Sequence, residues 1–501
     1  MNKYYYQEKY RPQFHFTPET NWMNDPNGLV YYEGEYHLFY QFHPHGSTWG
    51  PMHWGHAISK DLVSWEHLPI ALFPDHNGYI FSGSAVIDWN DTSGFFNGGS
   101  GIVAIFTHAD TYPDSDRPRQ RQSLAYSADS GRSWTTYEGN PVLTDEGITD
   151  FRDPKVFWHE PSGKWIMILA AGNCVRMYFS SNLKEWTFAS VFGHEAGSHA
   201  GVWECPDLFE LPVDEDPDKT KWVMIVSIGN AEEYAEGSRT QYFIGHFDGI
   251  QFINENDSAT TLWLDHGRDN YAGVTWSDIP KEDGRRVFIG WMSNWKYANQ
   301  TPTEVWRSAM TIPRVLALRS MPEGTRLVQT PVSDLETLRL EKLEWSDLTL
   351  TPNNNILSDI SGKKFEMIAK FELDSAAEFG FKVLKSEGQE TVIGYDTAAQ
   401  TLFIDRTRSG AADFCGHFPC KHAAALLPIH NRIKMHIFVD WSSVEVFGND
   451  GILAMTDQIF PDHSSTGLEV YAKEGSVKLV SLMMFPLQPI YSADKSVVMN
   501  S

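Results

Sequence analysis

The chain has 501 residues, of which 42% are hydrophobic and 21% charged, as in an ordinary folded protein of about two domains. Its net charge is −25, from 65 acidic and 40 basic residues, so its surface repels phosphate backbones and anionic membranes. We therefore expect neither nucleic acid nor a membrane as a partner.

The N-terminal stretch and the cysteines bear on location. Residues 1–10 are polar and aromatic and lack the apolar core of a signal peptide, and no apolar run approaches the length of a membrane span. Four cysteines in the chain fit a reducing compartment. Cys415 and Cys420, close to His417 and His422, match no standard zinc spacing, so no metal is expected. The expected location is cytoplasmic, or secreted if a leader has been removed.

Short strands follow one another through the first two thirds of the chain, and long helical periodicity is nearly absent. Each apolar run is rich in β-branched or aromatic residues and is bounded by Gly, Pro, Asn or Asp. This pattern predicts an all-β protein, with strands at 36–42, 101–108, 165–172, 221–229 and 285–292.

A repeated unit appears when the turns are aligned. Residues 56–68, 124–137 and 178–188 each contain a strand, a Ser, a polar turn and a Trp, and 245–254 is a weaker copy. Such a unit predicts a hairpin whose polar turn side chains bond the backbone while the aromatic ring packs between neighbouring sheets. Repeats of this size are typical of propeller blades, and residues 1–335 hold enough chain for five.

The pattern changes after the repeats. Residues 332–345 are charged, and the part at about 336–345 is the expected connecting segment. Period-2 alternation with frequent turn signals then predicts an antiparallel β-sandwich over 346–501. The expected strands of this second domain lie at 364–373, 379–385, 401–407, 433–451 and 467–473.

Two Asp-Pro motifs lie where strands meet turns. In WMNDPNG (22–28), Pro26 biases Asp25 away from helical backbone and holds it extended, although an Asp that caps a turn explains the same run. In FRDPKV (151–156), Arg152 is expected to lower the pKa of Asp153 and keep that carboxyl ionised. A structural ion pair explains the second motif equally well.

A third acidic motif, WECPDLF (203–209), surrounds Glu204 with Trp203, Cys205 and Pro206. Apolar surroundings penalise a charged carboxyl, as a general acid requires. If the blades radiate from a common axis, these three carboxylates converge. Glycoside hydrolysis needs one carboxylate to attack or stabilise the anomeric centre and one carboxylic acid to protonate the leaving oxygen.

These three motifs, in this order, resemble those of glycoside hydrolase family 32, the invertases, levanases and exo-inulinases. The segments 78–86, 264–273, 290–295, 306–314 and 438–451 are similar to other blocks of that family, so the resemblance covers nearly the whole chain. It implies a five-bladed β-propeller followed by a β-sandwich, chemistry without a cofactor or metal, and a homodimer as one arrangement found among relatives.

Carried over residue by residue, the resemblance implies that Asp25 is the nucleophile, Glu204 the acid/base and Asp153 the transition-state stabiliser. A retaining geometry predicts carboxyl groups of Asp25 and Glu204 about 5–5.5 Å apart. Trp22 and Trp49 are expected to offer apolar faces to the sugar ring, and Trp291, Trp295 and Trp306 are candidates for the pocket wall. The remaining expected pocket residues are Asn24, Gln41, Phe81, Ser82 and Arg152.

The implied activity is a retaining exo-β-fructosidase that removes terminal fructose from levan, inulin, fructo-oligosaccharides or sucrose. Residues 294–314 are more similar to the levanase and exo-inulinase branch than to the sucrose-6-phosphate hydrolases, and an acidic chain suits an uncharged substrate. Invertase, sucrose-6-phosphate hydrolase and fructosyltransferase activities remain alternatives within the family. The linkage preference, β-2,6 or β-2,1, is left open.

Three alternatives lie outside the family. A non-catalytic sugar-binding propeller would tolerate loss of any of the three acids, yet all three are present in context. A sialidase is suggested by the Asp-box-like SADSGRSW (127–134), but it requires an arginine triad that is not identifiable here. An inverting arabinanase-like enzyme would have its carboxyl groups about 6.5–9.5 Å apart.

Overall fold

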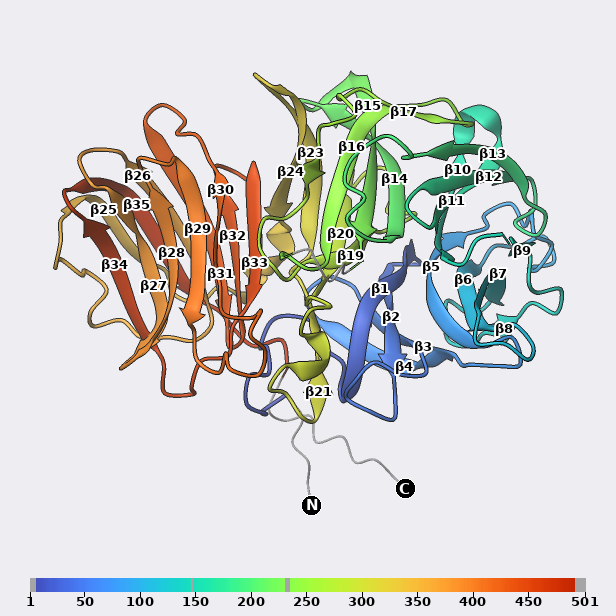
Figure 1. Ribbon diagram of the computed structural model, residues 1–501, viewed down its shortest axis with the longest axis horizontal. Coiled ribbons are helices and arrows are strands. Elements are labelled where there is room, and N and C mark those ends of the chain that lie inside the picture. Colours follow the sequence, from blue (N-terminus) through green and yellow to red (C-terminus); the bar gives the residue numbers. More distant parts are fainter. Residues whose placement is uncertain (1–5, 146, 230–234, 492–501) are drawn as a thin grey trace.

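The computed structural model describes residues 6–145, 147–229 and 235–491, and Figure 1 shows two β-rich bodies side by side. In these ranges the only helices are three short 3-10 turns, at Glu160–Ser162, Ala298–Gln300 and Ser333–Leu338. The all-β prediction is confirmed, with a five-bladed propeller followed by a sandwich. None of the described helices is long and apolar enough to cross a membrane.

Four antiparallel strands form the body of each of the five propeller blades. The first blade contains β1 (Asn21–Tyr32), β2 (Glu35–His43), β3 (His53–Ser59) and β4 (Trp65–Leu72). The second contains β5 (Tyr79–Ile87), β6 (Ile102–Thr111), β7 (Pro118–Ser127), β8 (Thr135–Thr136) and β9 (Leu143–Thr144). The third contains β10 (Phe151–His159), β11 (Lys164–Ala171), β12 (Val175–Ser180) and β13 (Thr187–Phe192).

The last two blades are joined by one parallel bridge into a single continuous sheet. The fourth contains β14 (Trp203–Val213), β15 (Asp216–Ile228), β16 (Arg239–Phe247) and β17 (Phe252–Asn254), with β18 (Leu262–Trp263) beside β16. The fifth contains β19 (Tyr271–Thr275), β20 (Arg286–Met292), β23 (Arg314–Met321) and β24 (Gly324–Pro331), with β22 (Ala309–Met310) beside β20.

The first strand of every blade faces the propeller axis. These inner strands, β1, β5, β10, β14 and β19, contact one another in a closed ring. A short strand from the fifth blade, β21 (Trp306–Arg307), pairs in parallel with Asn21 and Trp22 of β1. This pairing ties the last blade to the first and fixes the start of the strand that carries Asp25.

The predicted repeat corresponds to the outer hairpin of the first four blades. At its turn a side chain accepts a backbone N–H two residues further on: Asp61 from Val63 at 2.9 Å, Asn182 from Lys184 at 3.0 Å and Asp248 from Ile250 at 2.8 Å. Asp129 plays the same part four residues before its donor, Ser133. The repeat therefore marks blade edges rather than the axis.

The sandwich stacks a six-stranded sheet on a five-stranded one around a large apolar core. The first sheet has β25 (Leu343–Leu350), β35 (Val477–Pro486), β26 (Phe365–Glu372), β31 (Arg432–Asp440), β32 (Ser443–Gly448) and β33 (Leu453–Gln458). The second has β30 (Lys421–Ala425), β29 (Thr401–Arg408), β28 (Gln389–Asp396), β27 (Glu378–Ser386) and β34 (Gly467–Lys473). The division into 1–335 and 346–501 stays a prediction. β24 ends at Pro331 and β25 already begins at Leu343.

Buried charges join the propeller to the sandwich. Arg314 at the start of β23 bonds Glu445 of β32 at 2.5 Å and Asp265 at 3.0 Å. Arg406 of β29 bonds Asp269 at 2.5 Å and the hydroxyl of Tyr297 at 2.8 Å. Since both guanidinium groups are fully buried, each depends on its partners across the interface.

Candidate active site

All five inner strands break their pairing register at corresponding positions. The irregularities lie between Met23 and Pro26 in β1, Phe81 and Gly83 in β5, Arg152 and Lys155 in β10, Glu204 and Asp207 in β14, and Tyr271 and Val274 in β19. A bulge turns the side chains beside it away from the regular alternation. The ring of bulges therefore gathers Asp25, Ser82, Arg152, Asp153, Glu204, Cys205 and Tyr271 around the axis.

Asp25 is held by three donors. Ser82 Oγ donates to its Oδ2 at 2.7 Å, Asn24 Nδ2 donates to its Oδ1 at 3.0 Å, and the Cys205 thiol lies 3.4 Å from Oδ2. Burial and the neighbouring Glu204 raise the pKa of Asp25, while these hydrogen bonds act in the opposite direction. Hydrogen bonds to both carboxyl oxygens fix the orientation of this side chain.

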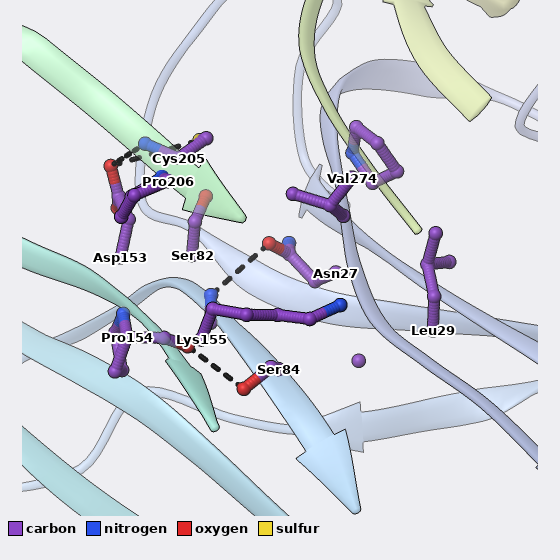
Figure 2. Close-up of a pocket in the computed structure, with 13 residues that line it drawn as sticks. Asn27, Leu29, Ser82, Ser84, Asp153, Pro154, Lys155, Cys205, Pro206 and Val274 are labelled. Atoms are coloured by element: carbon purple, nitrogen blue, oxygen red, sulfur yellow. Dashed lines mark hydrogen bonds between the residues drawn. The ribbon is translucent and has the colours of Figure 1, made fainter. Parts of the chain in front are cut away.

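Asp153 lies on the other side of the same thiol. The backbone N–H of Cys205 donates to Asp153 Oδ2 at 3.0 Å, and Cys205 Sγ lies 3.7 Å from that oxygen (Figure 2). Asp153 and Cys205 both have positive φ, +64° and +46°, which non-glycine residues adopt at a cost of about 1–3 kcal/mol. Asp25 and Asp153 thus flank one cysteine.

The expected low pKa of Asp153 is wrong. Burial raises the pKa of Asp153 to about 7, and the charges of Glu204 and Asp25 add to this effect while Arg152 opposes it. Arg152 Nε stays 3.9 Å from Asp153 because the guanidinium turns to Asp150 at 2.6 Å and to Glu204 at 3.0 Å. The charge of Arg152 still lowers the pKa of Asp153, but burial of the Asp153 carboxyl outweighs it.

Glu204 is held at both carboxyl oxygens. Arg152 Nη2 donates to Oε1 at 3.0 Å, and the Tyr271 hydroxyl donates to Oε2. The apolar neighbourhood expected from Trp203, Cys205 and Pro206 is therefore wrong. The carboxyl group faces a guanidinium and a phenol, because the bulge directs it into the ring of inner strands.

Tyr271 was not among the residues expected from the sequence. It lies in β19, which like β5 contains no acidic residue, and burial raises the pKa of its hydroxyl well above the ordinary value. A three-residue motif at the bulge of each inner strand identifies Tyr271 in retrospect. These motifs begin at residues 24, 81, 152, 204 and 271, one in each inner strand. In that order they are Asn-Asp-Pro, Phe-Ser-Gly, Arg-Asp-Pro, Glu-Cys-Pro and Tyr-Ala-Gly.

Trp22 does not offer a face to a sugar ring, as the sequence predicted, because it is fully buried. Trp295 stacks on it, with ring centroids 6.0 Å apart and planes inclined by 27°, and Trp291 packs against it edge-on. Its indole N–H donates to Asn24 Oδ1 at 2.7 Å. Trp22 thus orients Asn24, which in turn bonds Asp25.

Three other expected pocket residues lie around the β5 end of the site. Gln41 is buried and donates to the carbonyl of Ile80 at 3.0 Å. Trp49 is 44% exposed and meets Phe81 edge-on at 6.2 Å. Trp49 and Phe81 therefore form an aromatic rim, whereas Gln41 supports the backbone beside it.

The remaining tryptophans differ in how deeply they are buried. Trp295 is half-buried, but Trp291 is fully buried and Trp306 is 3% exposed. Trp306 packs with Tyr10, Tyr297, Phe418 and Phe460 in a cluster shared with the sandwich. Trp306 and Trp291 are therefore core residues, and their expected place in the pocket wall is wrong.

A small cavity continues beneath the carboxylates along the axis. Ser82, Asp153, Cys205, Asn27 and Lys155 line it, as Figure 2 shows. Lys155 is buried, lies 3.4 Å from Asp207 and donates to the carbonyl of Thr275 at 2.6 Å. Over the described ranges, no group of three or more His, Cys, Asp or Glu residues is placed to hold a metal ion.

Two family models together match most of the chain. The Glycosyl hydrolases family 32 N-terminal domain matches residues 15–331, and the Glycosyl hydrolases family 32 C terminal model matches residues 334–486. A levanase of Bacillus subtilis is 57% identical over 97% of this chain and 72% of its own length. A levanase of Bacillus sp. strain L7 is 43% identical, and the chain spans about half of it, 54%.

Fungal relatives match over most of both chains. The extracellular exo-inulinase of Aspergillus niger is 39% identical over 94% of each chain. The crystal structure of an exo-inulinase from Aspergillus awamori superposes with a TM-score of 0.88 at 37% identity, covering 97% of this chain and all of the other. A β-fructofuranosidase of Schwanniomyces occidentalis complexed with fructosyl-erythritol gives a TM-score of 0.86 at 35% identity, covering 97% and 98%.

Proposed function

This chain belongs to glycosyl hydrolase family 32, and from that premise we propose that it is a retaining exo-β-fructosidase in which Asp25 is the nucleophile and Glu204 the acid/base. One observation carries the assignment. Three inner strands bring one carboxyl group each to the axis, and hydrogen-bond donors from neighbouring strands hold each carboxyl. The levanase and exo-inulinase relatives support fructans and sucrose as substrates.

In the first step, Asp25 attacks the anomeric C2 of a terminal fructose while Glu204 protonates the departing oxygen. Ser82, Asn24 and the Cys205 thiol stabilise the ionised form of Asp25 that attack requires. Arg152 and Tyr271 hold the Glu204 carboxyl in one orientation. A fructosyl-enzyme and the free remainder of the substrate are the products of this step.

In the second step, Glu204 takes a proton from water, and the resulting nucleophile releases fructose from Asp25 with the original anomeric configuration. Asp153 binds sugar hydroxyls more strongly as oxocarbenium character develops. The carboxyl separation of about 5–5.5 Å expected for a retaining enzyme stays a prediction. No step requires a cofactor.

Sugar release over time tests this function. Levan, inulin, sucrose and sucrose-6-phosphate are incubated with the enzyme and sampled from the earliest minutes by chromatography. We expect fructose as the sole product from levan or inulin from the first sample, and the faster polymer gives the linkage preference. Oligosaccharides in the first samples would contradict exo-action, and transfer of fructose to another sugar would define a fructosyltransferase.

Sucrose-6-phosphate is the second candidate substrate. A phosphate group requires unpaired cationic donors at the rim. Arg152, which lies among the carboxyl groups of the site, already bonds Asp150, Gln120 and Glu204. We therefore expect sucrose to be cleaved at least as fast as its phosphate.

The names of the relatives bear on the location of the enzyme. The exo-inulinases are described as extracellular, which agrees with the secreted alternative and gives no support to the cytoplasmic expectation. A homodimer and the absence of nucleic acid or membrane partners remain expectations. Light scattering of the purified protein measures the oligomeric state.

A further inference from the structure

Cys420, His422 and Asp457 form a line at the edge of the sandwich. Cys420 immediately precedes β30, His422 lies in β30, and Asp457 lies in β33 of the other sheet. Cys420 Sγ is 3.5 Å from His422 Nδ1, and His422 Nε2 is 2.7 Å from Asp457 Oδ2. Because an ionised carboxylate only accepts, Nε2 carries a proton and the other ring nitrogen faces the sulfur.

The arrangement has the order nucleophile, base and orienting carboxylate that activates a cysteine. Asp457 is fixed in turn, since Arg406 lies 3.4 Å from its Oδ1 and the backbone N–H of Arg268 donates to the same oxygen at 3.3 Å. Cys420 itself is half-buried, and the residue before it, Pro419, is exposed. Cys420 is thus partly accessible, and its thiol is held beside His422.

The charges around the pair favour a thiolate beside an imidazolium. Burial raises the pKa of the Cys420 thiol, but His422 and Arg406 outweigh it, and the pKa falls below its ordinary value. Burial lowers the pKa of His422, but Asp457 and Cys420 raise it to about 9. The groups that face the pair are Asp457 from β33, Arg406 from β29 and His266 of the propeller.

We propose that Cys420 is a reactive thiol site for small disulfides and soft electrophiles, with His422 as its base and Asp457 as the residue that orients the base. With a disulfide, the Cys420 thiolate attacks one sulfur. A new S–S bond forms as the old one breaks, and the other half leaves as a thiolate that takes a proton from solvent. The protein gains a mixed disulfide, and no external oxidant is consumed.

The other three cysteines differ from Cys420. Burial raises the pKa of Cys174 and raises that of Cys205 well above its ordinary value, so both are disfavoured as thiolates. Cys415 is also half-buried, but its thiol lies 3.8 Å from the carbonyl of Lys296, a neutral partner. Cys415 is therefore an internal control of similar exposure in the same segment.

The test is site-resolved alkylation of the native enzyme. Iodoacetamide is added between pH 6 and 9, the reaction is quenched at intervals, and mass spectrometry of peptides gives a rate for each cysteine. At pH 6.5 we expect Cys420 to react at least about tenfold faster than Cys415, with a midpoint below the value of about 8.5 for a free thiol. A rate no greater than that of Cys415, or a midpoint at or above that value, overturns the proposal.

A matched variant tests the base. His422→Asn keeps a polar side chain and removes the imidazolium, and we expect Cys420 alkylation at pH 6.5 to slow about tenfold while Cys415 is unchanged. Oxidised glutathione is the disulfide probe, and its reaction is monitored by the mass added to the Cys420 peptide. An unchanged rate in a folded variant overturns the role of His422, and the wild-type pH profile decides the matter if the variant does not fold.

Discussion

The hydroxyl of Tyr271 donates a hydrogen bond to Oε2 of Glu204, so β19, which contains no acid of its own, helps to hold the proposed acid/base. Arg152 holds Oε1 from β10, the inner strand on the other side of β14. A carboxyl bonded at both oxygens cannot rotate freely. Orientation of the acid/base therefore depends on the packing of β14 between β10 and β19.

Tyr271→Phe removes the hydroxyl and keeps the ring. A hydrogen bond to a charged group contributes about 1.5–3 kcal/mol, so we expect kcat to fall roughly 10- to 100-fold. KM should change less than about threefold, because the ring still fills its site. Steady-state kinetics on sucrose measure both, and a large rise in KM with an unchanged kcat would assign Tyr271 to substrate binding instead.

Asp25→Asn should abolish turnover and leave the fold intact, since the amide retains the shape but is not a nucleophile. We expect at least about a 10³-fold loss of kcat on every substrate. Circular dichroism and thermal melting check the fold. Ser82→Ala is the matched comparison, because it removes one donor to Asp25 and should cost only about tenfold. Substantial hydrolysis by Asp25→Asn would exclude Asp25 as the nucleophile.

Glu204→Gln removes the proton donor, and its effect should depend on the leaving group. Fructosides whose leaving group departs as a stable anion need little protonation. They should retain far more activity than sucrose, and a ratio of losses above roughly 10 is expected. An equal loss across the series would argue against an acid role for Glu204.

Asp153→Asn should make stability less dependent on pH. The pKa of Asp153 is raised from 3.8 to about 7, so the folded protein binds this proton more tightly than the unfolded chain. The associated stability is fully present below pH 4 and is lost as the pH rises through 7. In the variant, the amide at position 153 cannot ionise.

At pH 8 we therefore expect Asp153→Asn to be more stable than the wild type, by roughly 1–3 kcal/mol, and to be nearly equal to it at pH 4. Melting temperatures across this range test the expectation. A difference that does not vary with pH, or a variant that is less stable at pH 8, would contradict the raised pKa.

The sequence predicts the blades because their outer hairpins repeat a local turn. Asp61, Asn182 and Asp248 bond backbone groups two residues away, and such chemistry is visible in a short window. Short motifs also locate the three acids, since Asp25 and Asp153 directly precede a Pro and Glu204 lies two residues before one. The directions of these side chains are not predictable in the same way, because they depend on bulges set by pairing with other strands.

Two wrong expectations have this cause. Arg152 precedes Asp153 in sequence yet its guanidinium reaches Glu204, and Trp22 is covered by Trp291 and Trp295, which follow it by more than 250 residues. Tyr271 was missed because a tyrosine followed by Ala and Gly is unremarkable alone. Only the alignment of the five inner strands shows that it occupies the position of Glu204 in the strand before.

Arg406→Met tests how far the propeller depends on the sandwich. Arg406 is fully buried and bonds Asp269, Tyr297 and the carbonyl of Phe418. Its loss leaves the buried Asp269 without its cation, which costs about 3–5 kcal/mol and should lower the melting temperature by roughly 6–15 °C.

The matched control for Arg406 is Arg408→Met on the same strand. Arg408 is 62% exposed and pairs with Glu390 at the surface, so we expect a cost below about 1 kcal/mol. Asp269→Asn combined with Arg406→Met should recover part of the loss, because no unpaired charge then remains. Equal effects of the two arginine variants would show that the interface charges contribute little. In that case the isolated propeller should fold without the sandwich. If the buried pair is important, removal of the sandwich should instead lower the stability of the propeller before it lowers catalytic activity.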